Sequence, residues 1–369
     1  MQKALALRVG IENSLCMVAA SGSDLPREIE RVLSEWEELR DPRVEPIAGG
    51  LIHQSFYVRD GDREYVLQRV SPIFSPGIQE NIVAVTEHLR ARGVRTPELL
   101  TTRAGRTCAE LGEGGRWRLE TWVPGVSFDS CEDEEQARSA AVLVARFHSA
   151  LHDLDHDFLP IGIPLHDTAF HLKNLEEALA GHPEHRLQLP VSELAAEIFA
   201  AVGSWEPLAG LPRRVVHGDL KFNNVLFAGR TGAARHQAVS LIDLDTVSRM
   251  PLYTELGDAW RSWCNRRGED VEEAELDEAL FRAAALGYLG ALTLDIEPDE
   301  RRSLALGIER ISLELAARFT ADALQESYFG WDAERFPAAG EHNLTRARGQ
   351  LSLYRQARET RAERMRLFD

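Results

Sequence analysis

The residues best suited to chemistry lie in two short polar segments. HGDLKFNN, residues 217–224, stands between two apolar runs, and LIDLD, residues 241–245, follows it. Phosphoryl transfer needs a carboxylate that receives a hydroxyl proton, oxygen ligands for Mg²⁺ and a cation near the phosphates. The order H-x-D-x-K-x-x-N, followed by an Asp at a strand, supplies these groups in the order found in protein kinases. The two segments therefore predict phosphoryl transfer.

Each polar residue of these segments has an expected role. Asp219 is the candidate catalytic base, which orients an acceptor hydroxyl, and Lys221 is expected to reach the γ-phosphate and offset its charge. Asn224 and Asp243 are candidate Mg²⁺ ligands, because both offer hard oxygen donors. His217 is expected to hold the loop in place rather than to act as a base. The structural alternative is a polar hairpin turn with an Asx cap. Such a turn would not explain why four polar residue types occur at this fixed spacing and are followed by a second Asp.

Two further aspartates have less certain positions. Asp245 shares a strand face with Asp243, so we expect it either to contact a second Mg²⁺ or to lie on the surface. Asp258, in ELGDAW, is expected to brace the catalytic loop at the start of a helix.

This set of motifs resembles the aminoglycoside phosphotransferase and choline kinase superfamily, whose signature is H-G-D, then N, followed by I-D. The resemblance runs from about residue 45 to the C-terminus. It implies an α+β, protein-kinase-like, two-lobed fold, with ATP and Mg²⁺ as cofactors. Within the superfamily, several segments are similar to the N-acetylhexosamine 1-kinase-like group: VLQRVSPIFSPGIQENIVAVTEHL, LIDLDTV, ELGDAW, YFGWD and HNLTRARGQLSL.

The nucleotide side departs from the pattern of the superfamily. No GxGxxG is present, and AGGLIHQS, residues 48–55, takes its place. Gly49 and Gly50 would let the backbone approach phosphates, although a plain glycine turn explains them equally well. In the strand YVLQR, residues 65–69, Gln68 occupies the usual Lys register. Arg69 resembles the Arg of choline kinases, and it is the candidate phosphate-binding cation.

Only one of Gln68 and Arg69 can point into a cleft, because neighbouring strand residues face opposite ways. We expect Arg69 to face the phosphates and to pair with Glu80 on the following helix, with a solvated carboxylate as the alternative for Glu80. Trp122, just before Pro124-Gly125, is a candidate to stack on adenine, with a core position as the alternative.

The surrounding elements form two groups. Before Pro124 we expect a helix at 24–40, a hairpin with strands at 55–58 and 64–70, a helix at 77–93, and strands at 97–101 and 116–123. After Gly125 we expect mainly helices, at 133–151, 191–202, 269–286, 300–324 and 341–366. We therefore interpret residues 1–40 as an N-terminal helical extension, 41–124 as a small antiparallel-sheet lobe for the nucleotide, and 125–369 as a larger helical lobe with the catalytic loop and acceptor site.

The composition excludes several classes of partner. The chain has 369 residues and a formal net charge of −17, which argues against binding to nucleic acid or to an anionic membrane. Its 4 cysteines form no CxxC pair, so neither a disulfide framework nor a zinc site is indicated. No apolar run approaches the ~18 residues of a membrane span. We predict a cytoplasmic protein whose partners are ATP and a small-molecule acceptor, and leave its oligomeric state open.

The sequence does not decide which class of small molecule accepts the phosphoryl group. A sugar is favoured, such as an N-acetylhexosamine phosphorylated at its anomeric hydroxyl, and an aminoglycoside or choline is the amine-bearing alternative. A pseudokinase that senses nucleotide or sugar is the alternative from another class. Gln68 and the absent glycine loop favour a pseudokinase, whereas the intact Asp219, Asn224 and Asp243 argue against it.

Overall fold

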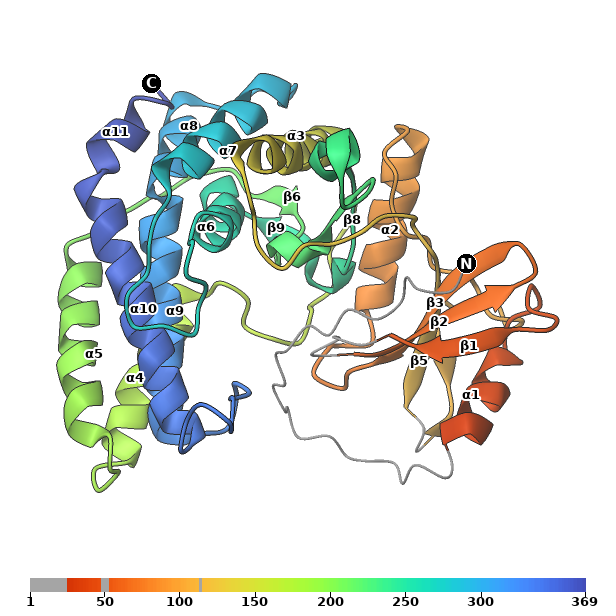
Figure 1. Cartoon of the computed structure of the whole chain (residues 1–369), viewed down its shortest axis with the longest axis horizontal. Coiled ribbons are helices and arrows are strands. Elements are labelled where there is room, and N and C mark those ends of the chain that lie inside the picture. Colours follow the sequence, from red (N-terminus) through yellow and green to blue (C-terminus); the bar gives the residue numbers. More distant parts are fainter. Residues whose placement is uncertain (1–24, 48–52, 113–114) are drawn as a thin grey trace.

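The N-terminal part of the chain forms a five-stranded antiparallel sheet, which lies on the right in Figure 1. The structure is a computed structural model that describes residues 25–47, 53–112 and 115–369. The strands follow the order β1-β2-β3-β5-β4 across the sheet: Arg43–Pro46 (β1), Gln54–Asp60 (β2), Arg63–Val70 (β3), Ala109–Glu110 (β4) and Arg116–Thr121 (β5). β2 and β3 form the predicted hairpin, and Gly61 in its turn has a φ of 62°, which glycine adopts without strain.

One face of the sheet is covered by α1 (Leu25–Leu33) and the turn that follows it. Alternation along the strands directs Leu67 and Trp117 to this face, where they pack in one apolar cluster with Trp36. The indole of Trp36 is buried, and its N–H donates a 3.1 Å hydrogen bond to the carbonyl of Leu100. The opposite face of the sheet is therefore the one that turns toward the rest of the molecule.

Helix α2 (Ile78–Ala91) lies between the sheet and the helical part of the chain (Figure 1). Ile82 and Leu89 belong to the apolar core of that helical part. The side-chain amide of Asn81 donates to the carbonyl of Leu159 and accepts from its N–H, each over 2.9 Å. These contacts fix α2 to the helical lobe.

The C-terminal lobe is mainly helical. It contains α3 (Glu134–Leu151), α4 (Thr168–Gly181), α5 (Gln188–Gly203), α6 (Leu252–Trp263), α7 (Glu278–Ala291), α8 (Pro298–Ser303), α9 (Gly307–Gln325), α10 (Ala339–Glu359) and α11 (Arg361–Met365). Two short antiparallel sheets lie among these helices, one of β6 (Arg214–Val216) with β9 (Ser248–Met250) and one of β7 (Val225–Phe227) with β8 (Ala238–Leu241). Within the described ranges, no helix is both long enough and apolar enough to cross a membrane.

A small antiparallel sheet and a larger helical lobe confirm the predicted α+β, two-lobed architecture. Several predicted elements differ in detail. The N-terminal helix ends at Leu33, and the strand expected at 97–101 is an irregular segment with one bridge, at Leu99. The helix expected from residue 269 begins only at Glu278, because the carboxylate of Asp277 caps it by accepting from the N–H groups of Ala279 and Leu280. Helix α4 was not predicted, and for α6 only a helix start near Asp258 was expected, whereas α6 begins earlier, at Leu252.

Helices α6 and α9 cross at backbone contact through two glycines. A Cβ added to Gly257 would lie 2.5 Å from the carbonyl carbon of Gly307, and one added to Gly307 would lie 2.8 Å from the Cα of Gly257. No side chain fits at either position unless a helix moves. Because α6 carries Glu255 and Asp258, this crossing determines where those two carboxylates lie.

We predict that Gly257→Ala lowers the free energy of unfolding by about 1–3 kcal/mol, since overpacking at this crossing must displace a helix. Gly290→Ala is the matched control, because Gly290 is exposed on α7 and an added Cβ there meets nothing within 4 Å. This control should gain about 0.5–1 kcal/mol from the higher helix propensity of alanine. Urea denaturation measures both, and equal losses at the two positions would contradict the close approach.

Candidate active site

The segment 217–224 forms the loop between β6 and β7, and Glu255 holds its first turn. Glu255 is buried and accepts hydrogen bonds of 2.8 Å from the backbone N–H groups of both His217 and Gly218. Burial alone would raise the pKa of Glu255, but His148 and these contacts hold it below its ordinary value. Gly218 has a φ of 87°, and a Cβ there would lie 2.5 Å from the carbonyl oxygen of Thr246. Only glycine fits this position.

His217 ties the loop to the segment that carries the paired aspartates. Its Nδ1 accepts from the N–H of Asp219, so its Nε2 carries a proton and donates to the carbonyl of Ile242 over 2.8 Å. The hydroxyl of Thr246 donates to the carbonyl of His217, also over 2.8 Å. These contacts agree with the predicted holding role of His217.

The brace expected from Asp258 is supplied instead by Glu255, one helical turn earlier on α6. Asp258 lies in the interior of α6, where its Oδ1 accepts from Nε and Nη2 of Arg261 over 3.0 and 2.8 Å. Burial alone would raise the pKa of Asp258, but Arg261, His166 and Lys221 lower it. Asp258 is therefore a charged neighbour of the loop rather than its support.

Asp219 and Lys221 form an ion pair that is partly open to solvent. The Nζ of Lys221 lies 3.1 Å from Oδ2 of Asp219, and the side chains are 45% and 20% exposed, respectively. The carboxylate of Asp219 is the main reason why the pKa of Lys221 is raised. Asn224 donates from its side-chain nitrogen to the carbonyl of Asp219 over 2.8 Å, which directs its Oδ1 to the other side.

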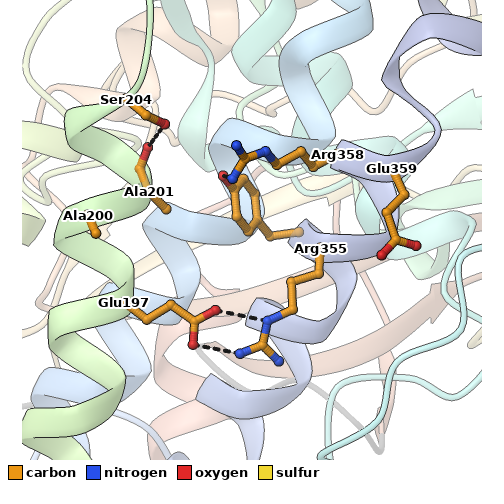
Figure 2. Close-up of a pocket in the computed structure, with 8 residues that line it drawn as sticks. Glu197, Ala200, Ala201, Ser204, Arg355, Arg358 and Glu359 are labelled. Carbon is orange, nitrogen blue, oxygen red and sulfur yellow. Dashed lines mark hydrogen bonds and ion pairs between the residues drawn. The ribbon is translucent and has the colours of Figure 1, made fainter.

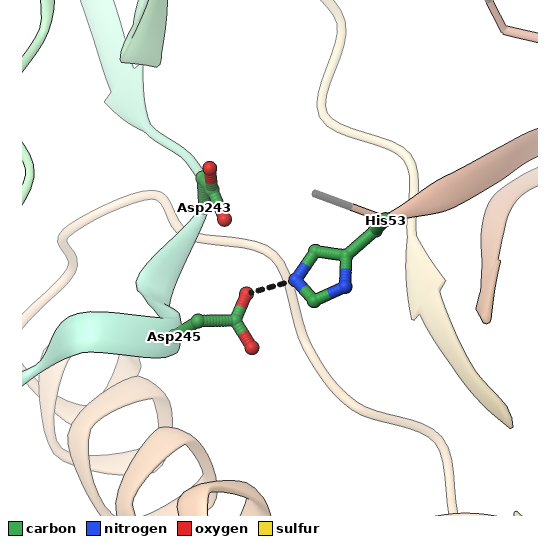
Figure 3. A group of neighbouring side chains, drawn as sticks. All are labelled: His53, Asp243 and Asp245. Carbon is green, nitrogen blue, oxygen red and sulfur yellow. Dashed lines mark hydrogen bonds and ion pairs between the residues drawn. The ribbon is translucent and has the colours of Figure 1, made fainter. Parts of the chain in front are cut away.

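Figure 3 shows Asp243 and Asp245, which follow β8, opposite His53, which precedes β2. The Oδ2 of Asp245 accepts from Nε2 of His53 over 3.1 Å, and its two oxygens accept from Nη1 and Nη2 of Arg118 over 2.6 and 2.7 Å. Nδ1 of His53 accepts from the N–H of Ser71, so the proton lies on Nε2. The surface position expected for Asp245 is wrong, because the residue is buried. Its role as a metal ligand stays a prediction.

The two aspartates differ in how their charge is neutralised. Burial alone would raise the pKa of Asp245, but Arg118 and His53 hold it well below its ordinary value. The pKa of Asp243 is raised well above its ordinary value, first by burial and then by the carboxylates of Asp245 and Asp219. No Lys or Arg of the described ranges forms an ion pair with Asp243.

The donor set at this point suits a hard divalent cation. The N–H of Ile242 donates to the carbonyl of Asn224 over 3.0 Å, so Asn224 and Asp243 lie at the paired ends of β7 and β8. Both offer oxygen atoms, which Mg²⁺ prefers, and the charge of Asp243 would be offset by such an ion. The residues present therefore fit Mg²⁺, and their ligand roles stay predictions.

The cation that faces these carboxylates from the sheet is Arg118, on β5. Its Nε and Nη2 donate to Oε1 of Gln68 over 2.8 and 2.6 Å, and Gln68 in turn donates to the hydroxyl of Ser55. Arg69 lies on the other face of the sheet, with its guanidinium 6.0 Å from the ring centroid of Trp117. The expected orientations are therefore reversed, and Gln68 faces the carboxylates while Arg69 faces away.

The expected pair of Arg69 and Glu80 is also wrong. Glu80 is exposed in the first turn of α2, and no ion pair of the described residues includes it. The physical reason is the register of β3 and β5, which places Arg69 opposite the core residue Trp117 and Gln68 opposite Arg118.

Two other predicted nucleotide contacts stay predictions. Gly49 and Gly50 lie outside the described residues. Trp122 is partly exposed and packs edge-on against Tyr57 at 5.2 Å, while its backbone N–H donates to the carbonyl of Glu64 over 3.0 Å. Trp122 therefore continues the edge of the sheet beside the chain segment that joins the lobes.

A separate pocket lies between α5 and α10, on the side of the helical lobe away from the sheet (Figures 1 and 2). Glu197 accepts two hydrogen bonds from Arg355 across it, of 2.9 and 2.6 Å. No predicted site residue lines this pocket. It is therefore distinct from the catalytic loop.

Residues 43–292 match the phosphotransferase enzyme family. The chain belongs to this family. Membership of this family agrees with the phosphoryl transfer that the motifs predict.

The individual proteins that resemble this chain share little sequence identity with it. A homoserine kinase of Xanthobacter autotrophicus (strain ATCC BAA-1158 / Py2) is 26% identical over 202 residues, which is 55% of this chain and 60% of that protein. Among solved structures, an aminoglycoside phosphotransferase of Alicyclobacillus acidocaldarius is 18% identical with a TM-score of 0.61, covering 90% of this chain and 96% of that one. A choline kinase of Cryptosporidium parvum is 12% identical with a TM-score of 0.56, covering 92% and 97%. At these identities the structures show the fold alone, which is the predicted kinase-like fold.

We predict that Arg118→Met in this kinase lowers the free energy of unfolding by about 3 kcal/mol, because it leaves the buried charge of Asp245 without its main partner. The matched variant Arg69→Met should cost less than about 1 kcal/mol, since within the described ranges Arg69 forms no ion pair and its guanidinium lies beside the ring of Trp117. Chemical denaturation measures both. A larger loss at Arg69 than at Arg118 would contradict the assignment of the two faces.

A second prediction concerns the metal. Asp243→Ala should weaken Mg-ATP binding by at least tenfold and metal-free ATP binding by less than threefold, because the variant loses a proposed Mg²⁺ ligand. Calorimetry with and without Mg²⁺ measures the difference. Equal losses under both conditions would show that Asp243 acts only on the structure of the loop.

Proposed function

We propose that this kinase transfers the γ-phosphoryl group of ATP to a hydroxyl of a small, uncharged polyhydroxyl acceptor, a sugar such as an N-acetylhexosamine. The observation that carries the transfer reaction is the ion pair of Asp219 and Lys221 beside the adjoining Asn224 and Asp243. It supplies a proton acceptor, a cation and two oxygen donors within one braced loop and the strand end that pairs with it.

The carboxylate of Asp219 accepts the proton of the acceptor hydroxyl as the hydroxyl oxygen attacks the γ-phosphorus, while the bond from that phosphorus to the β–γ bridging oxygen breaks and ADP leaves. Lys221 offsets negative charge on the transferred oxygens. Asn224 and Asp243 would hold Mg²⁺, which neutralises phosphate charge when it is bound. Glu255 keeps the loop in position, because it holds the two N–H groups that precede Asp219.

The charge around the catalytic pair supports an uncharged acceptor. A polycationic aminoglycoside or choline would be favoured by excess negative charge. Outside the aspartates of the proposed metal site, the carboxylates near the catalytic pair have cationic partners. Lys221 pairs with Asp219, Arg261 pairs with Asp258 and Glu269, and His166 pairs with Glu314, while Arg318 is a further cationic group near His166.

An aromatic segment in the helical lobe supports a sugar in particular. Tyr328 is 48% exposed, and the carboxylate of Asp322 holds the segment by accepting from the N–H groups of Tyr328 and Phe329, each over 2.9 Å. Arg318, one of the cationic groups named above, lies 5.8 and 5.5 Å from the centroids of these two rings. Aromatic rings offer an apolar face to the C–H face of a sugar ring. This segment, YFGWD, is also among those that resemble the N-acetylhexosamine group.

A hydroxyl-bearing amino acid is the second candidate acceptor, because the 26% identical relative is a homoserine kinase. Such a zwitterion also carries no net charge, so the balance of charges at the site suits it as well. A choline-type cation or an aminoglycoside receives no such support from the site.

ADP release with Mg-ATP and a panel of acceptors tests the proposal. The panel contains N-acetylglucosamine, N-acetylgalactosamine, glucose, galactose, homoserine, choline and kanamycin. We expect one of the uncharged sugars to give the highest kcat/KM, at least tenfold above choline and kanamycin. Preference for either cation would reject the sugar, and Mg-ATP binding without transfer to any acceptor would favour a pseudokinase.

We predict that Asp219→Asn lowers turnover by about two to four orders of magnitude, because the variant keeps the shape of the side chain but cannot accept the proton. ATP should still bind, as measured by calorimetry. Asp299→Asn, at an exposed position on α8, is the matched control and should leave turnover unchanged. Undiminished acceptor phosphorylation by Asp219→Asn would reject the assignment of the base.

A further inference from the structure

His166 precedes α4 and lies against the catalytic loop. Its neighbour Leu165 fills the space beside Gly218, since a Cβ added to Gly218 would lie 2.9 Å from Cδ2 of Leu165. The chain just before α4 therefore packs directly against the residue that precedes Asp219. This segment belongs to none of the motifs that predict phosphoryl transfer.

The conformation of His166 is costly and tightly held. Its φ is 48°, and only Asp243 and Glu326 share a positive φ among the described non-glycine residues. Its Nδ1 lies 3.0 Å from Oε1 of Glu314, and the other oxygen of Glu314 accepts from the hydroxyl of Thr168 over 2.5 Å. Such strained conformations concentrate at functional sites, and Asp243 lies at the proposed metal site.

The second ring nitrogen of His166 is left for a ligand. The side chain is 4% exposed, yet Nε2 has no hydrogen-bond partner among the residues that the structure describes. Burial alone would lower the pKa of His166, but Glu314 and Asp258 raise it, while Arg318 opposes them and His171 is the other titratable group nearby. The carboxylate of Glu314 accepts, so the proton between the two residues lies on Nδ1 of His166, and Nε2 stays free to bind a hydroxyl group.

Asp258 offers the complementary group. Both hydrogen bonds from Arg261 go to its Oδ1, and Oδ2 has no partner within the described ranges. Asp258 lies near enough to both His166 and Lys221 for their charges to affect its pKa, and Lys221 in turn contacts Asp219. Two unpartnered polar atoms, Nε2 of His166 and Oδ2 of Asp258, thus lie beside the catalytic pair.

We propose that His166 and Asp258 together bind two neighbouring hydroxyl groups of the acceptor, one at Nε2 of His166 and the other at Oδ2 of Asp258. This inference rests on the proposed function, which it deepens by naming the residues that select a diol. A hydroxyl group both donates and accepts, so a vicinal diol satisfies both residues at once. An acceptor that lacks one of these hydroxyls leaves a buried polar group unpaired, which is strongly unfavourable.

The test is a double-mutant cycle between each residue and each acceptor hydroxyl. It uses the full chain and monodeoxy analogues of the sugar that the panel identifies. His166→Gln keeps an amide group that can bind Glu314 but loses the second ring nitrogen, and Asp258→Asn replaces the free acceptor with a donor. Both variants keep nearly the original shape, and circular dichroism checks that they are folded.

In the wild type, removal of the contacted hydroxyl should lower kcat/KM at least tenfold. In His166→Gln that loss should shrink to less than threefold for one hydroxyl, and in Asp258→Asn for a neighbouring one, with the affinity for Mg-ATP within twofold of wild type. His152→Gln, at an exposed histidine whose ring lies near the carbonyl of Ser149 and the carboxylate of Asp153, should show the same losses as wild type.

If the removal of a hydroxyl lowers kcat/KM by the same factor in the wild type and in all variants, the inference is overturned, while the proposed function is left intact. A wild type that phosphorylates no sugar would reject the proposed function and this inference together. A general loss of Mg-ATP affinity in His166→Gln and Asp258→Asn would also overturn the inference, because the residues would then support the fold rather than bind the acceptor.

Discussion

The buried carboxylate of Glu255 is the constraint on which the catalytic loop depends. A buried charge is tolerated only when it is fully hydrogen-bonded, and Glu255 meets that condition by taking the N–H groups of His217 and Gly218. His148, on α3, lies 3.3 Å from the same carboxylate, and its other ring nitrogen lies 2.9 Å from the hydroxyl of Tyr288 on α7. Helices α3, α6 and α7 therefore each contribute a side chain to the network around the Glu255 carboxylate.

The position of that charge is set in turn by backbone packing. Glu255 lies on α6 two residues before Gly257, where the backbone of α9 passes at contact distance. A shift of α6 would withdraw Glu255 from the loop and leave two N–H groups without an acceptor. The loop conformation is thus coupled to the packing of α6 against α9 in the core of the helical lobe.

The sequence predicts the parts of the site that depend on local spacing. Asp219, Lys221 and Asn224 stand within six residues of one another, so one loop places them together whatever the rest of the fold. Arg118 could not be predicted in this way. Alternation shows that Gln68 and Arg69 face opposite sides, but only the register between β3 and β5 decides which side belongs to the core.

Contacts between residues that are far apart in the sequence cannot be predicted from spacing either. Glu255 and Asp258 are three residues apart on one helix face, so the sequence cannot tell which of them meets the loop. His166 meets Glu314 and the catalytic loop only because α4 packs beside α9. The hairpin of β2 and β3 and the helices α2 and α3 follow from local patterns, and their positions agree closely with the prediction.

The placement of Arg118 has a consequence for the chemistry. In this structure its guanidinium is fully occupied by Gln68 and Asp245, with Glu120 beside it at 2.7 Å. Releasing it toward a phosphate would expose the buried charge of Asp245, which is costly. Arg118 therefore acts by holding the segment that carries Asp243 against the sheet. In the proposed mechanism, the charge of a bound phosphate would be offset by Lys221 and by Mg²⁺ held by Asn224 and Asp243, so the proposed catalytic groups all belong to the helical lobe.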